Sequence, residues 1–558
     1  MARFLPFYIT STLLTALIMT SCSGHHEKDF LQAETYICPN NMAEYIEVLA
    51  SNEFMGRAPF TKGETLSIAY LEKQFRALGL EPGWHDSYLQ EVPMMEVVVK
   101  PDEQMRIETQ SGLIQLEYIK DYVAFSPRVS PETHISEAAL IFAGYGIVAP
   151  EYGWDDYQGI DVKDKIVVVL VNDPGFATGN DNLFNGNAMT YYGRWPYKYE
   201  EAARQGAKGL MIIHDSPGAG YPWSVVTNGA RIPKLYLEDE TGYAERSGIE
   251  GWFTTEAATK IFAHAGLDFQ SQRNKAAEPD FQPVLLSARL KDFSMKKSFR
   301  YNTSQNVLGL LPGTDLAKEV IIYSAHWDHL GIGPALNGDS IYNGAVDNGT
   351  SLAWMLEIAR AFTRLENRPR RSVLFIAPTA EEQGLLGAFH YVQNPAFALH
   401  KTVANINNDL MLPLGPMKDV MITGYGQSEL DDLVKEAALR QDRYVVPDPT
   451  PQTGMFYRAD HFAFAKAGVP ALFARGNTHH REHGIEWTAQ KEKEWLENYY
   501  HKPTDKYDPE TWNLEGVAED ARLAFYIGWK LANSNHFPNW KEGSEFKAIR
   551  DTMMQKQP

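Results

Sequence analysis

The chain has 558 residues, of which 44% are hydrophobic and 22% are charged, and its formal net charge is −19. This length exceeds what one hydrophobic core usually covers, so we expect two to four domains. The acidic balance argues against a surface that binds nucleic acid, and the composition is that of an ordinary soluble globular protein.

The first 22 residues differ from the rest of the chain. Arg3 supplies a positive start, residues 7–19 are mostly apolar, and Thr20-Ser21-Cys22 follows. This is the pattern of a secretion signal, and it is short for a membrane span. Its ending resembles the lipoprotein box of bacteria. We therefore predict a lipoprotein signal peptide over residues 1–22 and a lipid on Cys22, which would anchor the protein in the cell envelope, on the periplasmic side or at the cell surface. An ordinary cleaved signal and a soluble secreted protein are the alternative.

Cysteine usage restricts the kind of metal site that the chain can form. Only one other cysteine, Cys38, accompanies Cys22. If Cys22 carries a lipid, no disulfide can form within the chain and zinc cannot be held by several thiolates. A bound metal must then be held by histidine and carboxylate side chains. Residues 23–34 are expected to be a polar tether.

Two regions precede the main predicted sheet. Apolar residues recur at helical spacing over residues 42–50 and 65–78, and residues 84–134 alternate in the manner of strands. From residue 137 the pattern changes to short buried strands, many turns and one short helix at residues 198–205. This pattern predicts a small α+β module over residues 137–290.

From residue 306 onward, buried strands alternate regularly with amphipathic helices, such as those predicted at residues 351–364 and 384–393. Repeated strand–helix units predict an α/β domain with a mixed, mostly parallel sheet sandwiched by helices. We assign this domain to residues 291–535, followed by a C-terminal tail at residues 536–558.

Ionisable side chains of the types that bind zinc follow several of these predicted strands. His326 and Asp328 follow one strand, Glu381 and Glu382 follow the next, and Asp409 ends a third. Because an open α/β sheet places its chemistry at the carboxyl ends of its strands, we expect these side chains to meet at one edge. Two adjacent carboxylates repel each other unless they share a cation, although acids also favour the start of a helix.

Two further residues give weaker signals on their own. Asp347 precedes a predicted helix, where Asp is an ordinary N-cap. His501 lies in a loop after a predicted helix at residues 495–500. In chain order these positions read His, Asp, Glu-Glu, Asp, His between strands, and this order predicts a metal site.

The same positions lie in motifs that resemble the cocatalytic di-zinc aminopeptidases, a family related to glutamate carboxypeptidases. The matching motifs are Ala325-His326-Trp327-Asp328, residues 344–349, residues 380–387, Asn408-Asp409, Asp460-His461-Phe462, residues 467–471 and residues 501–505. They occur in the family's order within residues 304–533. The resemblance implies the zinc exopeptidase fold, with residues 35–136 as the N-terminal part of the peptidase domain.

The resemblance also implies a set of metal ligands. By this resemblance, His326 and Asp409 hold one zinc ion. Glu382 and His501 hold a second zinc ion, and Asp347 bridges the two. Three carboxylates nearly balance the charge of two Zn²⁺ ions, although histidine and carboxylate ligands also accept cobalt or manganese.

Other residues receive roles around these ligands. The resemblance implies that Glu381 is the general base and that Asp328 supports His326 from outside the metal ligands. Tyr457, Asp460 and His461 are candidates for contacts with substrate or with the oxyanion; for Tyr457, a packed aromatic ring is the simpler interpretation. A histidine-rich stretch at residues 479–483 matches no ligand of the family, and we interpret it as a surface or pocket rim.

The module at residues 137–290 resembles a protease-associated (PA) domain inserted into the peptidase, on the pattern of residues 155–169 and 202–213. Such a domain is non-catalytic in the family. The resemblance therefore predicts an exported metalloprotease, an aminopeptidase that hydrolyses N-terminal residues of peptides. No nucleic-acid partner is expected, and contact with a membrane is expected only through the lipid on Cys22.

Three alternatives stay open on the sequence alone. A glutamate carboxypeptidase-like exopeptidase would need a cationic pocket for a terminal carboxylate, for which Arg458 and Arg475 are candidates. A glutaminyl cyclase would use the same scaffold with one zinc ion. A non-catalytic binding protein is the remaining alternative, and the filled ligand positions argue against it.

Overall fold

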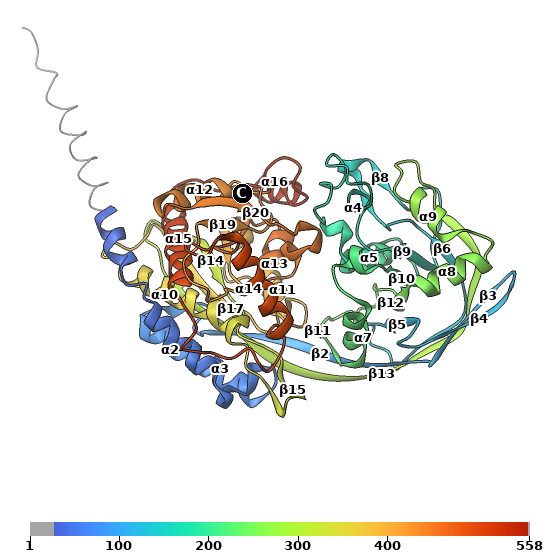
Figure 1. Ribbon diagram of the computed structural model, residues 1–558, viewed down its shortest axis with the longest axis horizontal. Helices are drawn as coiled ribbons and strands as arrows, with labels where there is room; N and C mark the ends of the chain where they lie inside the picture. Colours follow the sequence, from blue (N-terminus) through green and yellow to red (C-terminus); the bar gives the residue numbers. More distant parts are fainter. Residues whose placement is uncertain (1–26, 556–558) are drawn as a thin grey trace, which may run out of the picture. The chain divides into compact units, whose positions relative to one another are not determined.

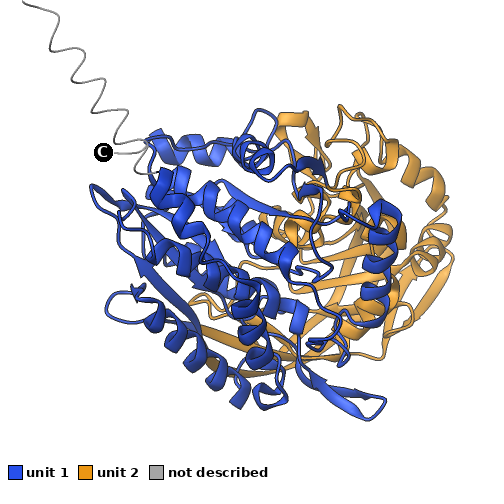
Figure 2. Cartoon of the chain, turned by 60° about the vertical axis from the view of Figure 1, so that its left-hand side comes forward, with its two compact units in different colours: residues 1–92, 304–447, 459–558 blue, residues 93–303, 448–458 orange. Residues whose placement is uncertain are grey.

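The computed structural model describes residues 27–555. The predicted signal peptide and Cys22 lie outside these residues. The chain divides into two compact units, shown in blue and orange in Figure 2: unit 1 comprises residues 1–92, 304–447 and 459–558, and unit 2 comprises residues 93–303 and 448–458. Unit 2 therefore begins and ends outside the module predicted at residues 137–290, and it includes a short segment from the C-terminal half of the chain.

Unit 1 contains a mixed, mostly parallel sheet, as predicted. Its parallel centre consists of β17 (Arg371–Ala377), β14 (Leu316–Ser324), β18 (Thr402–Asn407) and β21 (Ala471–Arg475), in that order. On one side, the end of β13 (Val284–Leu311) pairs antiparallel with β17 and with β1 (Glu81–Pro82). On the other side, β19 (Asp419–Ile422) is antiparallel to β21 and parallel to β20 (Tyr444–Pro447).

The central strands are largely buried, and most of their residues are apolar. Tyr323 and Phe375 stack at a centroid distance of 5.4 Å on one face. There they pack with Phe362 of helix α10 (Ser351–Thr363), and helix α15 (Glu515–Ala532) lies against the same core. The helices of unit 1 are labelled in Figure 1 and further include α2 (Pro39–Leu49), α3 (Lys62–Leu78), α11 (Leu386–Gln393), α12 (Leu430–Arg440), α13 (His461–Lys466), α14 (Gly484–Asn498) and α16 (Lys547–Gln555).

Unit 2 has its own hydrophobic cores, one on each face of its strands. These strands belong to the same continuous sheet, because β13 pairs with strands of both units. Four parallel strands form the centre of unit 2, and they are β6 (Glu132–Phe142), β9 (Ile166–Leu170), β10 (Gly209–His214) and β12 (Ile249–Thr254). The other strands are β2 (Leu89–Pro101), which begins in unit 1, β3 (Gln104–Thr109), β4 (Gly112–Glu117), β5 (Tyr122–Phe125), β11 (Lys234–Leu237) and the first part of β13. Its helices are α4 (Pro174–Thr178), α5 (Trp195–Arg204), α6 (Ser216–Ala219), α7 (Trp223–Arg231), α8 (Thr255–His264) and α9 (Phe269–Lys275). This is an α+β arrangement; its assignment as a PA domain stays a prediction.

Both ends of the described chain differ from the sequence prediction. Residues 27–34 are helical rather than a loose tether, because Phe30 is fully buried and stacks on Phe525 at a centroid distance of 5.1 Å. In the predicted C-terminal tail, Trp540 is buried and its indole N–H donates to the carbonyl oxygen of Gly468 at 3.1 Å. Within residues 27–555, no helix is long and apolar enough to cross a membrane.

Candidate metal centre

The predicted ligands lie at the carboxyl ends of three neighbouring parallel strands. His326 follows β14, Glu381 and Glu382 follow β17, and Asp409 follows β18. In the sheet β14 lies between β17 and β18, so these ends meet at one edge.

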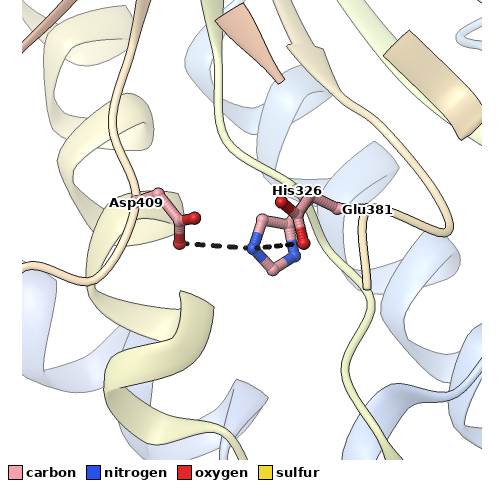
Figure 3. A group of neighbouring side chains, drawn as sticks. All are labelled: His326, Glu381 and Asp409. Carbon is pink, nitrogen blue, oxygen red and sulfur yellow. Dashed lines mark hydrogen bonds and ion pairs between the residues drawn. The ribbon is translucent and has the colours of Figure 1, made fainter. Parts of the chain in front are cut away.

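The first group of side chains consists of His326, Glu381 and Asp409, which are all buried (Figure 3). The Nε2 atom of His326 lies 3.3 Å from Oδ1 of Asp409 and 3.9 Å from Oε2 of Glu381. Both carboxylates therefore face the same ring nitrogen. Its other nitrogen, Nδ1, donates to the backbone carbonyl oxygen of Asp328 at 3.0 Å, which fixes the orientation of the ring.

The second group consists of His329, Asp347 and Glu382, and His501 lies against it. The Nδ1 atom of His329 lies 2.6 Å from Oε1 of Glu382, and the Nε2 atom of His501 lies 3.1 Å from its Oε2. Glu382 therefore has one imidazole at each carboxylate oxygen.

Asp347 lies between the two groups. Its Oδ1 is 3.5 Å from Nε2 of His326, and its Oδ2 is 3.2 Å from Nε2 of His501. The Oδ1 atom thus faces both His326 of the first group and His329 of the second, and Oδ2 faces His501, so this carboxylate is in reach of both groups. Asp505 holds it in place by accepting hydrogen bonds from the backbone N–H groups of Val346 and Asp347.

A fully buried arginine, Arg57, supports the backbone around both groups. Its guanidinium donates hydrogen bonds to five backbone carbonyl oxygens, those of Leu49, Trp327, Asn343, Gly344 and Asp347. Arg57 thereby ties Trp327, the residue after His326, to the loop that carries Asp347.

Electrostatics in the first group favour a bound cation. Burial raises the pKa of Glu381 well above its ordinary value, and Asp409 adds to the rise while His326 opposes it. Burial also raises the pKa of Asp409, which His326 partly offsets. Burial lowers the pKa of His326, but the two carboxylates outweigh this effect and raise it well above its ordinary value. Buried carboxylates at such spacing are stabilised by positive charge.

The second group differs because two imidazoles surround one carboxylate. Burial would raise the pKa of Glu382, but His501 and His329 more than offset it and hold the pKa well below its ordinary value. The pKa values of the adjacent residues Glu381 and Glu382 are therefore shifted in opposite directions. Glu382 is suited to act as an anionic ligand, and Glu381 is suited to hold a proton.

Asp328 lies behind both Glu381 and His326. Its Oδ1 accepts the backbone N–H of Glu381 at 3.0 Å and lies 3.7 Å from Nδ1 of His326. The close contact with His326 is thus made by the backbone carbonyl of Asp328 and not by its carboxylate. Burial raises the pKa of Asp328 to about 6.

The structure separates the three substrate-contact candidates. Asp460 and His461 are buried in unit 1 at the start of α13, and burial raises the pKa of Asp460 to about 8, against an opposing effect of His326. Tyr457 belongs to unit 2, where its ring packs against Phe456 and Tyr191. A role for Tyr457 at the oxyanion stays a prediction.

Three residues around the site were not foreseen from the sequence. His329 lies three residues after His326, in the segment His326-Trp327-Asp328-His329. A second histidine so close to a predicted ligand was the sequence signal that could have marked it as a site residue. Asp505 closes the motif that begins at His501, but its role depends on a contact with residues more than 150 positions earlier. Arginine is usually exposed, so the sequence around Arg57 does not predict that this side chain is fully buried.

A cavity of about 700 Å³ lies beside the site without including any predicted metal ligand. Val346 and Asp505 line it, together with five aromatic residues, which are Trp487, Trp495, Tyr499, Tyr507 and Trp512. His480 and His483, from the histidine-rich stretch, also line it, and their rings stack at a centroid distance of 4.7 Å. The predicted pocket-rim interpretation fits this position, although His480 itself is buried.

Comparison with known proteins gives a family match for a part of the chain that lies mostly in unit 1. The model of peptidase family M28 matches residues 306–526. This part of the chain is therefore similar to peptidase family M28. This match agrees with the resemblance found in the sequence, and the matched residues include the six side chains of the two groups and His501.

Two similar curated proteins are named aminopeptidases. Aminopeptidase YwaD of Bacillus subtilis (strain 168) is 34% identical over 124 residues, which cover 22% of this chain and 25% of that protein. Aminopeptidase NAALADL1 of Mus musculus is 34% identical over 122 residues, which cover 21% of this chain and 15% of that protein. The similarity thus spans a quarter or less of these relatives.

Solved structures give weaker likenesses over a longer stretch. An aminopeptidase from Aneurinibacillus sp. strain AM-1 aligns over 91% of this chain and 97% of its own, with 18% identity and a TM-score of 0.48. The zinc aminopeptidase BSAP from Bacillus subtilis aligns over 92% and 97%, with 17% identity and a TM-score of 0.42. At these values neither likeness supports a statement about activity.

Proposed function

We propose that the protein is an exported zinc-dependent aminopeptidase that hydrolyses the N-terminal residue of peptides. The observation that carries this proposal is the pair of buried histidine–carboxylate groups joined by Asp347. The match of residues 306–526 to family M28 supports it, as do the names of two similar curated proteins, which are aminopeptidases. Another similar curated protein, from Arabidopsis thaliana, is named a probable glutamate carboxypeptidase, so that alternative also has a relative.

The side chains of both groups fit zinc. Zinc in proteins prefers imidazole nitrogen and carboxylate oxygen when thiolates are absent. The ligand atoms within each group lie within 4.8 Å of one another, so a small contraction around an ion would bring them to bonding distance. His326 and Asp409 would hold one ion, Glu382 and His501 the other, and Asp347 both. When bound, zinc supplies Lewis-acid activation of the scissile carbonyl group and of water.

Glu381 is the residue best suited to move a proton. Its carboxylate faces His326 from the same side as the ligands, and burial raises its pKa well above the ordinary value. A carboxylate in this position takes a proton from the attacking water and gives it to the leaving amine. Asp328 fixes the backbone of Glu381 and so keeps the carboxylate in reach.

His329 adds a third imidazole to the residues that can hold the metal. Its ring is fully buried, and its Nδ1 contacts the carboxylate of Glu382 and lies 3.9 Å from Oδ1 of Asp347. It would orient these two carboxylates or serve as a further ligand to the second ion. A glutaminyl cyclase with one zinc ion would not need a second complete group, so the presence of both groups favours the peptidase.

Export rests on the sequence of residues 1–22. We propose that Cys22 carries the lipid and that the folded part begins close behind it. Replacement of Cys22 by Ala should release soluble protein from the membrane fraction, while retention of the variant in that fraction would contradict the lipid anchor.

The decisive experiment combines metal content with activity. Protein comprising residues 23–558 should contain about two zinc ions per chain and should hydrolyse aminoacyl p-nitroanilides but not N-blocked peptides. Glu381→Ala should keep the metal and lose turnover. Glu366→Ala, a change of an exposed glutamate, is the matched control and should keep both. One zinc ion together with cyclisation of N-terminal Gln would replace the proposal by the cyclase.

A further inference from the structure

His329 belongs to the second group but uses only one of its two ring nitrogens. Its side chain is fully buried, and Nδ1 lies 2.6 Å from Oε1 of Glu382. Nε2 has no hydrogen-bond partner within residues 27–555. The role of this histidine depends on which nitrogen carries the proton, because a metal ligand offers a bare nitrogen and a hydrogen-bond donor offers an N–H group.

The spacing between side-chain atoms separates ligands from residues that support them. Two atoms bound to one tetrahedral zinc ion lie about 3.3 Å apart, since zinc binds nitrogen and oxygen at about 2.0–2.2 Å. Nε2 of His501 lies 3.1 Å from Oε2 of Glu382 and 3.2 Å from Oδ2 of Asp347, which fits a shared ion. Nδ1 of His329 lies 2.6 Å from Oε1 of Glu382 and 3.9 Å from Oδ1 of Asp347, which does not. The shorter distance is that of a strong hydrogen bond from an N–H group to a carboxylate.

His326 shows the contacts of a predicted histidine ligand in the same site. Its Nε2 faces Asp409 and Asp347 at 3.3 and 3.5 Å, and its Nδ1 donates to the backbone carbonyl oxygen of Asp328. Both ring nitrogens are used, as is usual for a histidine that binds a metal. If Nδ1 of His329 bound a metal, Nε2 would carry the proton, and this buried donor would have no acceptor within the described residues. With the proton on Nδ1, no donor of the ring is left unpaired.

The packing around His329 holds the ring in this orientation. Its backbone N–H donates to the carbonyl oxygen of Arg57 at 3.3 Å. Gly344 has a φ of +61°, and a Cβ there would lie 2.6 Å from Cδ2 and 2.7 Å from Cγ of His329. The ring of His501 also packs against it, at a centroid distance of 5.7 Å. The imidazole therefore has little freedom to turn, and Nδ1 stays directed at Glu382.

We propose that His329 is not a metal ligand but a positioning residue, which donates from Nδ1 to Oε1 of Glu382 and leaves only Oε2 for the second ion. The protein then holds one oxygen of this carboxylate, so Glu382 binds the metal through a single atom. A carboxylate that binds through one oxygen suits tetrahedral zinc, whereas manganese favours more oxygen ligands in octahedral geometry. His329 thus favours zinc over manganese at the second ion.

The presence of a metal beside Glu382 rests on the proposed function, whereas the hydrogen bond follows from the contacts of His329 alone. The ligand set implied by the family resemblance does not include His329. Its role is therefore assigned from the distances and from the unpartnered Nε2 in this protein.

Zinc content separates a ligand from a positioning residue. His329→Leu and His329→Asn would be compared with the unmodified protein and with His501→Ala, which removes a predicted ligand. His480→Leu is the matched control for the loss of a buried imidazole in unit 1, since His480 is 5% exposed and belongs to neither group. Mass spectrometry of the metal would give the zinc content, and competition with a chelator would give the affinity for the second zinc ion.

His329→Leu should keep about two zinc ions per chain at saturating zinc. It should bind the second ion about 10–100-fold more weakly, which is the usual effect of removing a residue that orients a ligand. His329→Asn should keep most of the affinity, because the asparagine amide can donate a hydrogen bond from nearly the position of Nδ1. His480→Leu should leave content and affinity unchanged.

Three results would overturn the proposal. Loss of about one zinc ion at saturation in either His329 variant, as expected for His501→Ala, would make His329 a ligand. Unchanged affinity in His329→Leu would leave the histidine without a role at the metal. Equal weakening in His329→Leu and His329→Asn would assign the effect to packing and not to the hydrogen bond.

The ratio of the zinc and manganese affinities is a second readout, which a general loss of stability does not change. In His329→Leu both oxygens of Glu382 are free to bind the metal, so the zinc-to-manganese ratio at the second ion should fall by about tenfold. His329→Asn should keep most of the ratio. An unchanged ratio in His329→Leu would contradict binding of Glu382 through a single oxygen.

Metal-free protein separates this proposal from the proposed function. His329→Leu, Glu382→Leu and the double variant would be unfolded with urea in the presence of a chelator. The effects of the two substitutions on the unfolding equilibrium constant should deviate from additivity by about tenfold or more, as expected for a hydrogen bond to a charged group. Such coupling in a protein that binds no zinc would reject the proposed metal centre and keep the hydrogen bond. Additive effects would overturn the hydrogen bond even if the protein binds zinc and hydrolyses peptides.

Discussion

Arg57→Lys gives a direct test of how the metal centre is supported. Lysine keeps the positive charge but has three N–H donors where arginine has five. Five carbonyl oxygens accept from Arg57, so at least two would lose their partner. A buried polar group without a partner costs about 1–3 kcal/mol, which gives a loss of about 2–6 kcal/mol in the free energy of unfolding. This is a large part of the 5–15 kcal/mol typical of a whole domain.

The same substitution should weaken metal binding, because Arg57 joins the backbone beside His326 to the loop that carries Asp347. Urea unfolding would measure the stability, and competition with a chelator would measure zinc affinity of the folded protein. Arg371→Lys is the matched control, since Arg371 is equally buried but contacts Glu319, Leu531 and His536. It should lower stability without changing zinc affinity. If both variants change zinc affinity equally, or if Arg57→Lys changes neither quantity, the reasoning is wrong.

Four further outcomes follow from the geometry. Glu381→Gln should reduce kcat by about 10²–10⁴-fold with the zinc content unchanged, since only proton transfer is removed; loss of metal would contradict this role. Asp409→Ala and His501→Ala should each lower the zinc content by about one ion per chain, because each removes a ligand of a different group. Removing zinc with a chelator should lower the unfolding temperature of unit 1 and leave that of unit 2 unchanged, as calorimetry can show, since binding stabilises only the unit that holds the ligand. Lys297 has its pKa lowered to about 8 by burial, with Arg128 adding to the effect. Between pH 8 and 10.5 the unfolded chain therefore binds a proton that the folded chain does not, so stability should rise with pH in this window; Lys297→Met should reduce that slope, measured by urea unfolding at several pH values.

Most of unit 1 can be predicted from the sequence, because its strands and helices are indicated by patterns among residues that are close together in the chain. The apolar runs before His326, Glu381 and Asp409 are strong strand patterns, and parallel strands bring their carboxyl ends together without further information. The family motifs then supply Asp347 and His501, whose individual signals are weak. The mixed, mostly parallel sheet and the convergence of these side chains agree with what the patterns predict.

The remaining features depend on contacts between residues far apart in sequence. Asp505 could be quoted as part of a motif, but its hydrogen bonds to the loop of Asp347 cannot be read from spacing. The helical conformation of residues 27–34 follows from the packing of Phe30 on Phe525, almost 500 positions away. The composition of residues 23–34 is mostly polar and therefore predicts a tether, because Phe30, Leu31 and Ala33 are too few to form a periodic pattern. Likewise, the membership of residues 448–458 in unit 2 has no local signal in an otherwise regular α/β sequence.

Local imbalance of charge, rather than net charge, identifies where this protein binds ligands. The formal charge of −19 describes the whole surface and does not indicate the metal centre. In unit 1, four carboxylates converge on a few imidazoles inside the fold, which requires additional positive charge and accounts for a metal.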